Sequence, residues 1–334
     1  MRVAVFSSKP YDREFLSAAN EGARHEVVFL DVRLTEATAA LASGFAAVCV
    51  FVNDRLDAAT IGRLSAGGTL LVALRCAGTN NVDLAAADAA GMAVVCVPDY
   101  SPNAVAEFTI GLMISLERQI HRAWARVREN NFSLDGLVGR NLHERTIAVV
   151  GTGRIGALVA RTLKLGFGCR VLAVDMIEDA ALKAIGVEYA SAADAMAAAH
   201  LITFHCPLTP ATRHMLDAAA IARATPGLMV VNTSRGALVD TPALIDGLKR
   251  GQIGGVALDV YEEEAAIFFE DLSDEIVQDD VFQRLLTFPN VLVTGHQAFL
   301  TQEALAFIAE ATLANIDAQE AGTPLKNQVG PATH

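Results

Sequence analysis

A glycine-rich turn follows a strongly apolar segment near the middle of the chain. Residues 146–150 read Thr-Ile-Ala-Val-Val, which predicts a buried strand, and the motif Gly-x-Gly-x-x-Gly spans residues 151–156 directly after it. The apolar spacing then predicts a helix over Ala157–Leu165. Glycines in such a turn let the backbone approach a pyrophosphate at the amino end of the helix. We therefore expect a dinucleotide site here, rather than the glycine turn that any α/β protein can contain.

An acidic residue ends the next predicted strand. Arg170–Val174 is apolar enough to form that strand, and Asp175 follows it, about 20 residues beyond the glycine motif. A carboxylate at this place accepts hydrogen bonds from the ribose hydroxyls and repels a 2′-phosphate. Residues 176–178 contain no Arg or Lys that could bind such a phosphate. The expected cofactor is therefore NAD rather than NADP.

One histidine among the eight of the chain is placed for proton transfer. His296 follows the predicted strand Val291–Thr294, at the carboxyl end of the strand, where open α/β sheets bind ligands. Since an imidazole gains and loses its proton close to neutral pH, His296 is the candidate proton donor. His205 ends another strand and is either structural or part of the cofactor site. The other six are expected at the surface: His25, His121, His143, His200, His214 and His334.

A cation and two carboxylates follow other predicted strands. Arg235 comes after the strand Leu228–Asn232, and its guanidinium suits bidentate capture of a substrate carboxylate. Asp259 ends the next strand, and Glu264 lies shortly beyond it. A carboxylate beside His296 would favour the protonated imidazole. From the residues alone, Glu264 is either that partner or a solvated loop charge.

Strands and helices alternate along the chain, which is typical of parallel sheets covered by helices on both faces. Up to residue 97 the predicted strands are Val3–Phe6, Val27–Leu30, Ala47–Phe51, Leu70–Ala73 and Val94–Val97. The predicted helices between them are Asp12–Ala19, Thr35–Ala42, Asp57–Ser65 and Leu84–Gly91. Ser101-Pro102 then opens a long, half-buried helix that continues to Ile120.

A second alternating series begins at Thr146. Its predicted strands are Thr146–Val150, Arg170–Asp175, Leu201–His205, Leu228–Asn232, Gly255–Asp259 and Val291–Thr294. The tail from Phe299 is helical over Thr301–Ala318, contains no further strand, and is expected to return to the first domain. The predicted fold is α/β, with two Rossmann-like doubly wound parallel-sheet domains. The NAD-binding domain, residues 101–298, is inserted into a discontinuous substrate domain, residues 1–100 and 299–334.

Charge and composition argue against several classes of protein. The chain has 334 residues and a formal net charge of −12, which disfavours nucleic-acid and anionic-membrane partners. No apolar run is long enough to span a membrane, and the apolar start of the chain is too short for a signal peptide. Five cysteines without a C-x-x-C pair favour reduced thiols in the cytoplasm and make a metal site unexpected.

Seven ordered blocks of the sequence resemble the D-isomer-specific 2-hydroxyacid dehydrogenases, and within that family they are most similar to the fermentative D-lactate dehydrogenases. The blocks are Leu74–Asp83, Val97–Glu107, Gly151–Gly156, His205–Thr209, Asn232–Gly236, Ala257–Glu264 and Thr287–Phe299. One departure is Glu144, which stands where relatives usually carry glycine. The resemblance implies the reversible reduction of pyruvate to D-lactate by NADH, in a homo-oligomer (dimer or tetramer).

The resemblance also implies a role for each matching residue. Arg235 would bind and polarise the keto acid, His296 would donate the proton, and Glu264 would pair with His296. Backbone N–H groups of the loop Cys76, Ala77, Gly78 and Thr79 would hold the substrate carboxylate, and Tyr100 and Phe299 would wall a small pocket that suits a methyl group. The residues expected to line NAD are Gly151, Gly153, Arg154, Ile155, Gly156, Asp175, Cys206, Pro207, Thr212, Thr233, Ser234 and Asp259.

Two other interpretations stay open. A related dehydrogenase would act on a branched 2-keto acid, on glyoxylate or on hydroxypyruvate, since one methylene changes discrimination by only about 1–3 kcal/mol. A dinucleotide-sensing binding protein, similar to a corepressor, would share the fold. The set Arg235, Glu264 and His296 favours catalysis over this last interpretation.

Overall fold

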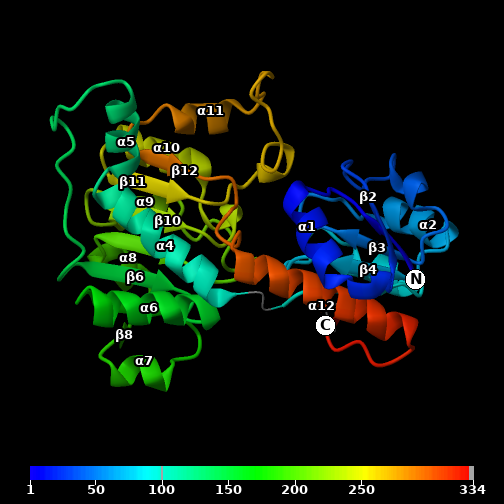
Figure 1. Ribbon diagram of the computed structural model, residues 1–334. Coiled ribbons are helices and arrows are strands. Elements are labelled where there is room, and N and C mark those ends of the chain that lie inside the picture. Colours follow the sequence, from blue (N-terminus) through cyan, green and yellow to red (C-terminus); the bar gives the residue numbers. More distant parts are fainter. Residues whose placement is uncertain (99–100, 331–334) are drawn as a thin grey trace. The chain divides into compact units, whose positions relative to one another are not determined.

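The computed structural model of the protein describes residues 1–98 and 101–330, so the predicted substrate residue Tyr100 and the predicted surface residue His334 lie outside the described residues. The chain folds into two compact units, each built around one sheet (Figure 1). Unit 1 comprises Met1–Ser101 and Phe299–His334, and unit 2 comprises Pro102–Ala298. Unit 2 is therefore inserted between the two segments of unit 1.

The sheet of unit 1 has the strand order β13-β5-β4-β3-β1-β2. Its strands are β1 (Arg2–Val5), β2 (Glu26–Phe29), β3 (Ala47–Val50), β4 (Leu71–Leu74), β5 (Ala93–Val95) and β13 (Gln328–Val329). Only β13 is antiparallel. Every residue of β3 and β4 is buried, as expected for continuous apolar runs in a parallel sheet covered on both faces. The chain order reverses between β1 and β3, the place where such sheets bind ligands.

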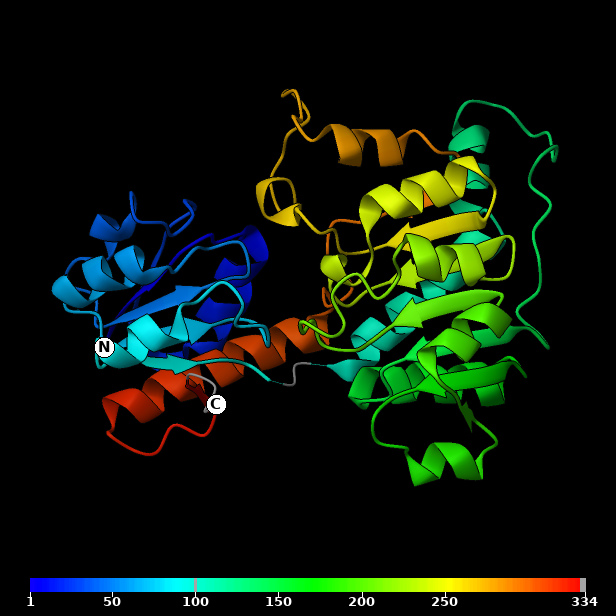
Figure 2. The ribbon, with the colours of Figure 1, turned by 180° about the vertical axis from the view of Figure 1, so that it is seen from behind.

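The returning tail forms a helix that completes unit 1 (red in Figures 1 and 2). This helix, α12 (Gln302–Glu320), contacts α1 (Pro10–Ala19) and β4, so the expected return of the tail is confirmed. The remaining helical segments of the unit are η1 (Glu21–Ala23), η2 (Ala39–Ala42), α2 (Ala58–Ala66) and α3 (Leu84–Ala89).

The sheet of unit 2 is parallel throughout and has the order β12-β11-β10-β9-β6-β7-β8. Its strands are β6 (Thr146–Val150), β7 (Arg170–Val174), β8 (Glu188–Tyr189), β9 (Leu201–Phe204), β10 (Leu228–Asn232), β11 (Ile253–Leu258) and β12 (Val291–Val293). Chain order reverses between β6 and β9, as in doubly wound dinucleotide-binding sheets.

Helices cover both faces of the unit 2 sheet, and a separate apolar core lies under each face. On one face lie α4 (Pro102–Glu117) and α6 (Arg154–Gly166), which contact each other. On the other lie α8 (Ala192–Ala198), α9 (Ala218–Arg223) and α10 (Thr241–Lys249). The remaining helical segments are α5 (Ile120–Arg128), α7 (Ala180–Ala184), η3 (Gly236–Leu238), η4 (Glu264–Ala266) and α11 (Asp280–Leu286). The predicted fold class, two doubly wound α/β sheets, is confirmed.

Several expectations about single elements are wrong. The helix predicted over Thr35–Ala42 is shorter than expected, because residues 35–38 form a turn and only Ala39–Ala42 are helical, as the 3-10 helix η2. The Thr38 hydroxyl donates to Arg33 O at 2.6 Å and competes with helical hydrogen bonds. The tail does contain a strand, β13, which pairs with the sheet edge at β5 but is too short for periodicity to reveal. The long helix from Pro102 ends at Glu117, since Gln119 has a φ of 50° and separates α4 from α5.

His25 is also placed differently from the expectation. It is 2% exposed rather than at the surface. Its Nε2 lies 2.8 Å from Asp317 Oδ1, and its Nδ1 lies 3.0 Å from the amino-terminal nitrogen of Met1. Asp317 belongs to α12, so the returning tail is what covers this histidine.

Candidate active site

The glycine turn, residues 151–156, joins β6 to α6 where the strand order of unit 2 reverses. Gly151 has a φ of 88°, which glycine adopts without steric cost, and its N–H donates to Val174 O at 2.8 Å. A Cβ on Gly151 would lie 2.6 Å from the backbone nitrogen of Cys206, and one on Gly156 would overlap the Gly151 carbonyl oxygen. Both positions require glycine, because the backbones approach too closely for a side chain.

The middle glycine leaves room for a ligand. Gly153 is the N-cap of α6, it supplies no side-chain cap, and a Cβ at this position would meet nothing within 4 Å. Backbone N–H groups at the amino end of a helix attract anions, and Arg154 and Ile155 begin this one. A dinucleotide pyrophosphate fits this cradle of open space and backbone donors.

Asp175 is exposed and is oriented by the backbone around the glycine turn. Its Oδ2 accepts the Thr152 N–H at 2.6 Å and the Thr152 hydroxyl at 3.1 Å, and its Oδ1 accepts the Ile177 N–H at 3.2 Å. Partial burial raises the pKa of Asp175, but these hydrogen bonds outweigh it and hold the pKa below its usual value. The carboxylate is therefore charged and fixed, as the binding of ribose hydroxyls requires.

Replacing Asp175 with Asn should weaken discrimination against NADPH. The amide keeps an acceptor for Thr152 but no longer repels a 2′-phosphate, so the ratio of kcat/KM with NADPH to that with NADH should rise about tenfold or more. Initial rates with both cofactors give the ratio. Asp194→Asn, an exposed change on α8, is the matched control. An unchanged ratio would show that Asp175 does not select the cofactor.

Hydrogen bonds order the residues that follow β10. Asn232 is fully buried; its Oδ1 accepts the Ser234 N–H at 3.0 Å and its Nδ2 donates to Arg235 O at 2.8 Å. The Ser234 hydroxyl donates to Cys206 O at 2.9 Å, which ties this segment to the exit of β9. The Arg235 guanidinium donates to Ser234 O at 2.7 Å. Predicted cofactor residues from two strands are thus brought together beside the glycine turn.

The exit of β9 is compact and apolar in character. The Thr212 hydroxyl donates to Pro207 O at 2.7 Å and closes the turn that begins at Cys206. Burial raises the pKa of the Cys206 thiol to about 11, so the thiol is a neutral wall rather than a nucleophile. Burial lowers the pKa of His205 to about 3, and its Nε2 lies 3.0 Å from the Thr203 hydroxyl. His205 is therefore neutral and is not a second proton donor.

His296 and Glu264 are in direct contact. His296 Nδ1 lies 2.8 Å from Glu264 Oε1, and Glu264 Oε2 accepts the Tyr261 N–H at 2.8 Å. The two side chains are 19% and 22% exposed, so the pair is partly shielded from water. The rings of His296 and Phe269 have centroids 5.7 Å apart. Glu264 is therefore a fixed partner of the imidazole and not a solvated loop charge.

Asp259 fixes the loop that carries His296. It is fully buried; its Oδ1 accepts the Thr294 hydroxyl at 2.6 Å and the Gln297 N–H at 2.9 Å, and its Oδ2 accepts the Ala298 N–H at 2.8 Å. Burial raises the pKa of Asp259, although these hydrogen bonds oppose the shift. His296 itself has a φ of 54°, an uncommon conformation for a residue with a side chain. Hydrogen bonds on both sides of His296 stabilise that conformation.

Three threonines in or beside the site are not evident from the sequence. Thr109 of α4 lies 2.8 Å from the hydroxyl of Thr233, Thr152 holds Asp175, and Thr294 holds Asp259. Each forms a hydrogen bond with a residue in another element, so the neighbouring sequence does not reveal its role. Thr152 is a partial exception, because it lies inside the glycine motif.

The predicted substrate loop of unit 1 follows β4. Cys76 is buried, its thiol donates to Gly78 O at 3.3 Å, and its carbonyl accepts the Val97 N–H at 3.0 Å. Ala77 is exposed, whereas Gly78 and Thr79 are half-buried. The loop is thus tethered at one end and accessible at its tip, as a loop that binds a carboxylate through its backbone must be.

Arg75 anchors this loop and was not singled out from the sequence. It is 2% exposed, and its Nε lies 3.1 Å from Asp12 Oδ1. Its guanidinium lies over the ring of Phe51, 5.3 Å from the centroid. The ring of Phe299, a predicted pocket wall, lies 5.9 Å from that of Phe51. A buried ion pair therefore underlies the predicted substrate-binding residues of unit 1.

The described residues contain no helix that is both long and apolar enough to cross a membrane. In residues 1–98 and 101–330, no cluster of three or more His, Cys, Asp or Glu side chains could hold a metal ion. All five cysteines are buried thiols.

Comparison with known proteins agrees with this geometry. A family model described as D-isomer specific 2-hydroxyacid dehydrogenase, NAD binding domain, matches residues 110–298. The 2-hydroxyacid dehydrogenase homolog 1 of Schizosaccharomyces pombe is 52% identical over 316 residues, which cover 95% of either chain. The apo-structure of D-lactate dehydrogenase from Escherichia coli has a TM-score of 0.90 at 47% identity, and covers 98% of this chain and 100% of that one. The pyruvate reductase of Chlamydomonas reinhardtii has a TM-score of 0.93 at 42% identity, with 98% of both chains covered. The resemblance noted in the sequence is confirmed: the chain belongs to the D-isomer-specific 2-hydroxyacid dehydrogenase family, an NAD-dependent family of enzymes whose NAD-binding domain spans most of unit 2.

Proposed function

We propose that the protein is a D-lactate dehydrogenase that reduces pyruvate to D-lactate with NADH. The observation that carries the proposal is the contact between His296 and Glu264, held on a loop that Asp259 fixes. Relatives named D-lactate dehydrogenase and pyruvate reductase share this fold at 42% identity or more, which supports pyruvate as the substrate. The bound cofactor supplies a hydride to the keto carbon.

Each side chain has one task in this scheme. Glu264 binds Nδ1 of His296, so Nε2 is assigned to hold the proton that goes to the substrate oxygen. The Glu264 carboxylate stabilises the imidazolium before the proton leaves. Arg235 is proposed to bind the 2-keto acid through its guanidinium and to polarise the carbonyl. The loop Cys76–Thr79 is proposed to bind the substrate carboxylate through backbone N–H groups.

A panel of 2-keto acids tests the substrate. With NADH, kcat/KM should be about tenfold or more higher for pyruvate than for a branched 2-keto acid, glyoxylate or hydroxypyruvate, because the small pocket that Phe299 is proposed to wall would suit a methyl group. Initial rates of NADH oxidation measure this. A larger kcat/KM for another acid would identify that acid as the substrate, and the protein would remain a member of the family. No oxidation with any member would favour a dinucleotide sensor. A homo-oligomeric state and a cytoplasmic location remain predictions of the resemblance.

A further inference from the structure

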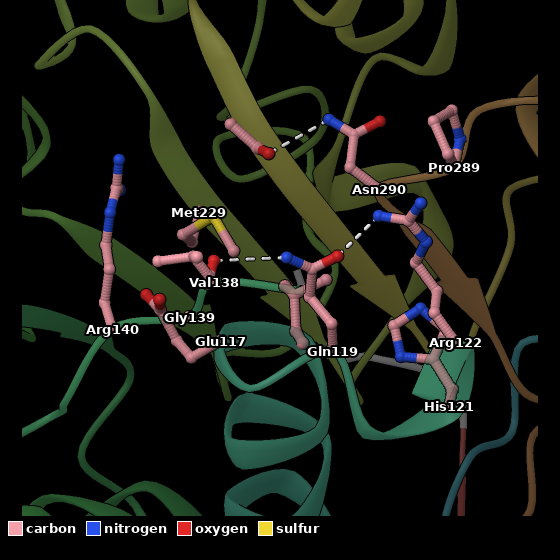
Figure 3. Close-up of a pocket in the computed structure, with 12 residues that line it drawn as sticks. Glu117, Gln119, His121, Arg122, Val138, Gly139, Arg140, Met229, Pro289 and Asn290 are labelled. Carbon is pink, nitrogen blue, oxygen red and sulfur yellow. Dashed lines mark hydrogen bonds between the residues drawn. The ribbon is translucent and has the colours of Figure 1, made fainter. Parts of the chain in front are cut away.

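A tyrosine hydroxyl of unit 2 contacts the glycine turn. Tyr189 ends β8, the edge strand beside β7 (Figure 1), and its ring is half-buried against the apolar core under α4 and α6. Its hydroxyl oxygen lies 3.0 Å from the hydroxyl oxygen of Thr152 and accepts the Asp179 N–H at 2.9 Å. Tyr189 and the glycine turn both lie at the carboxyl ends of strands, whereas the cavity in Figure 3 lies at the amino ends of β10, β11 and β12 and takes no part in these contacts.

The hydrogen bonds of these groups have one direction. The Asp175 carboxylate is charged, so it can only accept hydrogen bonds. The Thr152 hydroxyl therefore donates its one proton to Asp175 Oδ2, which lies 3.1 Å away. No proton of Thr152 is left for Tyr189, so the Tyr189 hydroxyl donates to Thr152. The result is a chain of donors that runs from Asp179 N–H through Tyr189 and Thr152 and ends on the Asp175 carboxylate.

This chain matters because little else holds the segment 176–178, which follows Asp175. Two of its side chains, Met176 and Ile177, are 99% and 79% exposed, so apolar packing does not fix them. The third side chain belongs to an exposed ion pair, which contributes little to stability. The segment is therefore held mainly at its two ends, by the hydrogen bonds of Asp175 before it and by the hydroxyl of Tyr189 after it.

We propose that Tyr189 is a positioning residue for the cofactor, which fixes the Asp175 carboxylate for the 2′-hydroxyl of the adenosine ribose and against a 2′-phosphate. Tyr189 acts through Thr152 and does not itself bind the cofactor. Aligned hydrogen bonds strengthen one another, and a carboxylate held in one orientation loses less freedom when a ligand binds. The inference rests on the expected role of Asp175, and it does not depend on which 2-keto acid the enzyme reduces.

Two cofactors that differ by one oxygen atom test the proposal. NADH and its 2′-deoxyadenosine analogue differ only in the hydroxyl that Asp175 is expected to bind. In Tyr189→Phe, the Kd for NADH should rise about fivefold, and the Kd for the deoxy analogue should change by less than about twofold. Isothermal titration calorimetry on the intact protein measures both constants without turnover. A tyrosine that only stabilised the fold would affect both cofactors equally.

NADPH examines the same carboxylate from the opposite direction. In Tyr189→Phe the Asp175 carboxylate is freer to turn away from a 2′-phosphate, so the Kd for NADPH should not rise as the Kd for NADH does. The ratio of the Kd for NADPH to that for NADH should therefore fall about fivefold or more. Tyr11→Phe removes the same hydroxyl group from a half-buried tyrosine of α1 in unit 1, and it should leave all three Kd values unchanged.

Variants of Thr152 test whether the effect passes through its hydroxyl. Thr152→Val keeps the shape of the side chain and the N–H that binds Asp175, but it removes the hydroxyl, so the Kd for NADH should rise about fivefold. Adding Tyr189→Phe to Thr152→Val should raise this Kd by less than about twofold further, because the chain of donors is already broken. Thr152→Ser keeps a hydroxyl and should retain more affinity for NADH than Thr152→Val does.

The proposal is wrong if the Kd of Tyr189→Phe for NADH stays within about twofold of the wild-type value, or if NADH and the deoxy analogue are weakened by the same factor. It is also wrong if the effects of Tyr189→Phe and Thr152→Val multiply. The wild-type protein shows which step fails. If it binds both cofactors equally, Asp175 does not bind the 2′-hydroxyl and Tyr189 has nothing to position. If it prefers NADH and Tyr189→Phe keeps that preference, Asp175 retains its role and only the inference about Tyr189 is overturned.

Discussion

His296→Gln is expected to lower kcat by about 10²–10⁴-fold while the Kd for NADH stays close to the wild-type value. The glutamine amide can still donate a hydrogen bond but cannot give up a proton, so the keto oxygen has no acid to protonate it. NADH affinity is expected to depend on the glycine turn and Asp175, which belong to other elements of unit 2. Stopped-flow single turnovers and NADH fluorescence titrations measure the two quantities separately.

Replacing Glu264, the partner of His296, should have a smaller effect on kcat than replacing His296 itself. Glu264→Gln keeps a side chain that can bind Nδ1 but removes the charge that stabilises the imidazolium, so kcat should fall by less than in His296→Gln. His143→Gln changes an exposed histidine and serves as the control for the loss of an imidazole. Turnover within a few-fold of wild type in His296→Gln would rule out His296 as the acid.

Catalytic candidates could be located from the sequence because apolar runs mark strands, and the carboxyl ends of parallel strands meet at one edge of a sheet. His296, Arg235 and Asp259 each follow such a run. What the residues alone could not reveal is how these side chains are oriented. The hydrogen bonds of Asp259 to the segment 294–298 depend on the left-handed backbone at His296, which no periodicity indicates.

The errors in the predicted elements also arise from features that apolar periodicity does not indicate. The spacing of apolar residues runs through Gln119, so it predicts one helix where a single left-handed residue makes two. Glu144 is similar: its φ is 61°, a conformation that favours glycine, but nothing in its own side chain signals the conformation. A two-residue strand such as β13 exists only because a sheet edge is available to pair with it. Such features are decided by tertiary contacts.

Arg75→Met is expected to destabilise the folded protein by about 3–5 kcal/mol, the largest stability effect among the predictions. Arg75 is 2% exposed, its Nε pairs with Asp12 Oδ1 at 3.1 Å, and its guanidinium donates to Phe6 O at 3.1 Å and Ser7 O at 3.3 Å. Methionine fills similar space but leaves Asp12, itself 8% exposed, as a buried charge without its cation. Urea unfolding followed by far-ultraviolet circular dichroism measures the loss.

Two further variants separate the buried charge from the lost volume. Arg63→Met breaks the exposed ion pair with Glu36, in which both side chains are more than half exposed, and should cost less than about 1 kcal/mol. Adding Asp12→Asn to Arg75→Met removes the uncompensated carboxylate and should restore part of the stability. If Arg75→Met and Arg63→Met lowered the free energy of unfolding by similar amounts, the buried pair would not be what holds the carboxyl ends of β1 and β4 together.

The loop Cys76–Thr79 follows directly on Arg75, so the KM for pyruvate should rise in Arg75→Met and stay unchanged in Arg63→Met. This result would connect the stability of unit 1 to substrate binding.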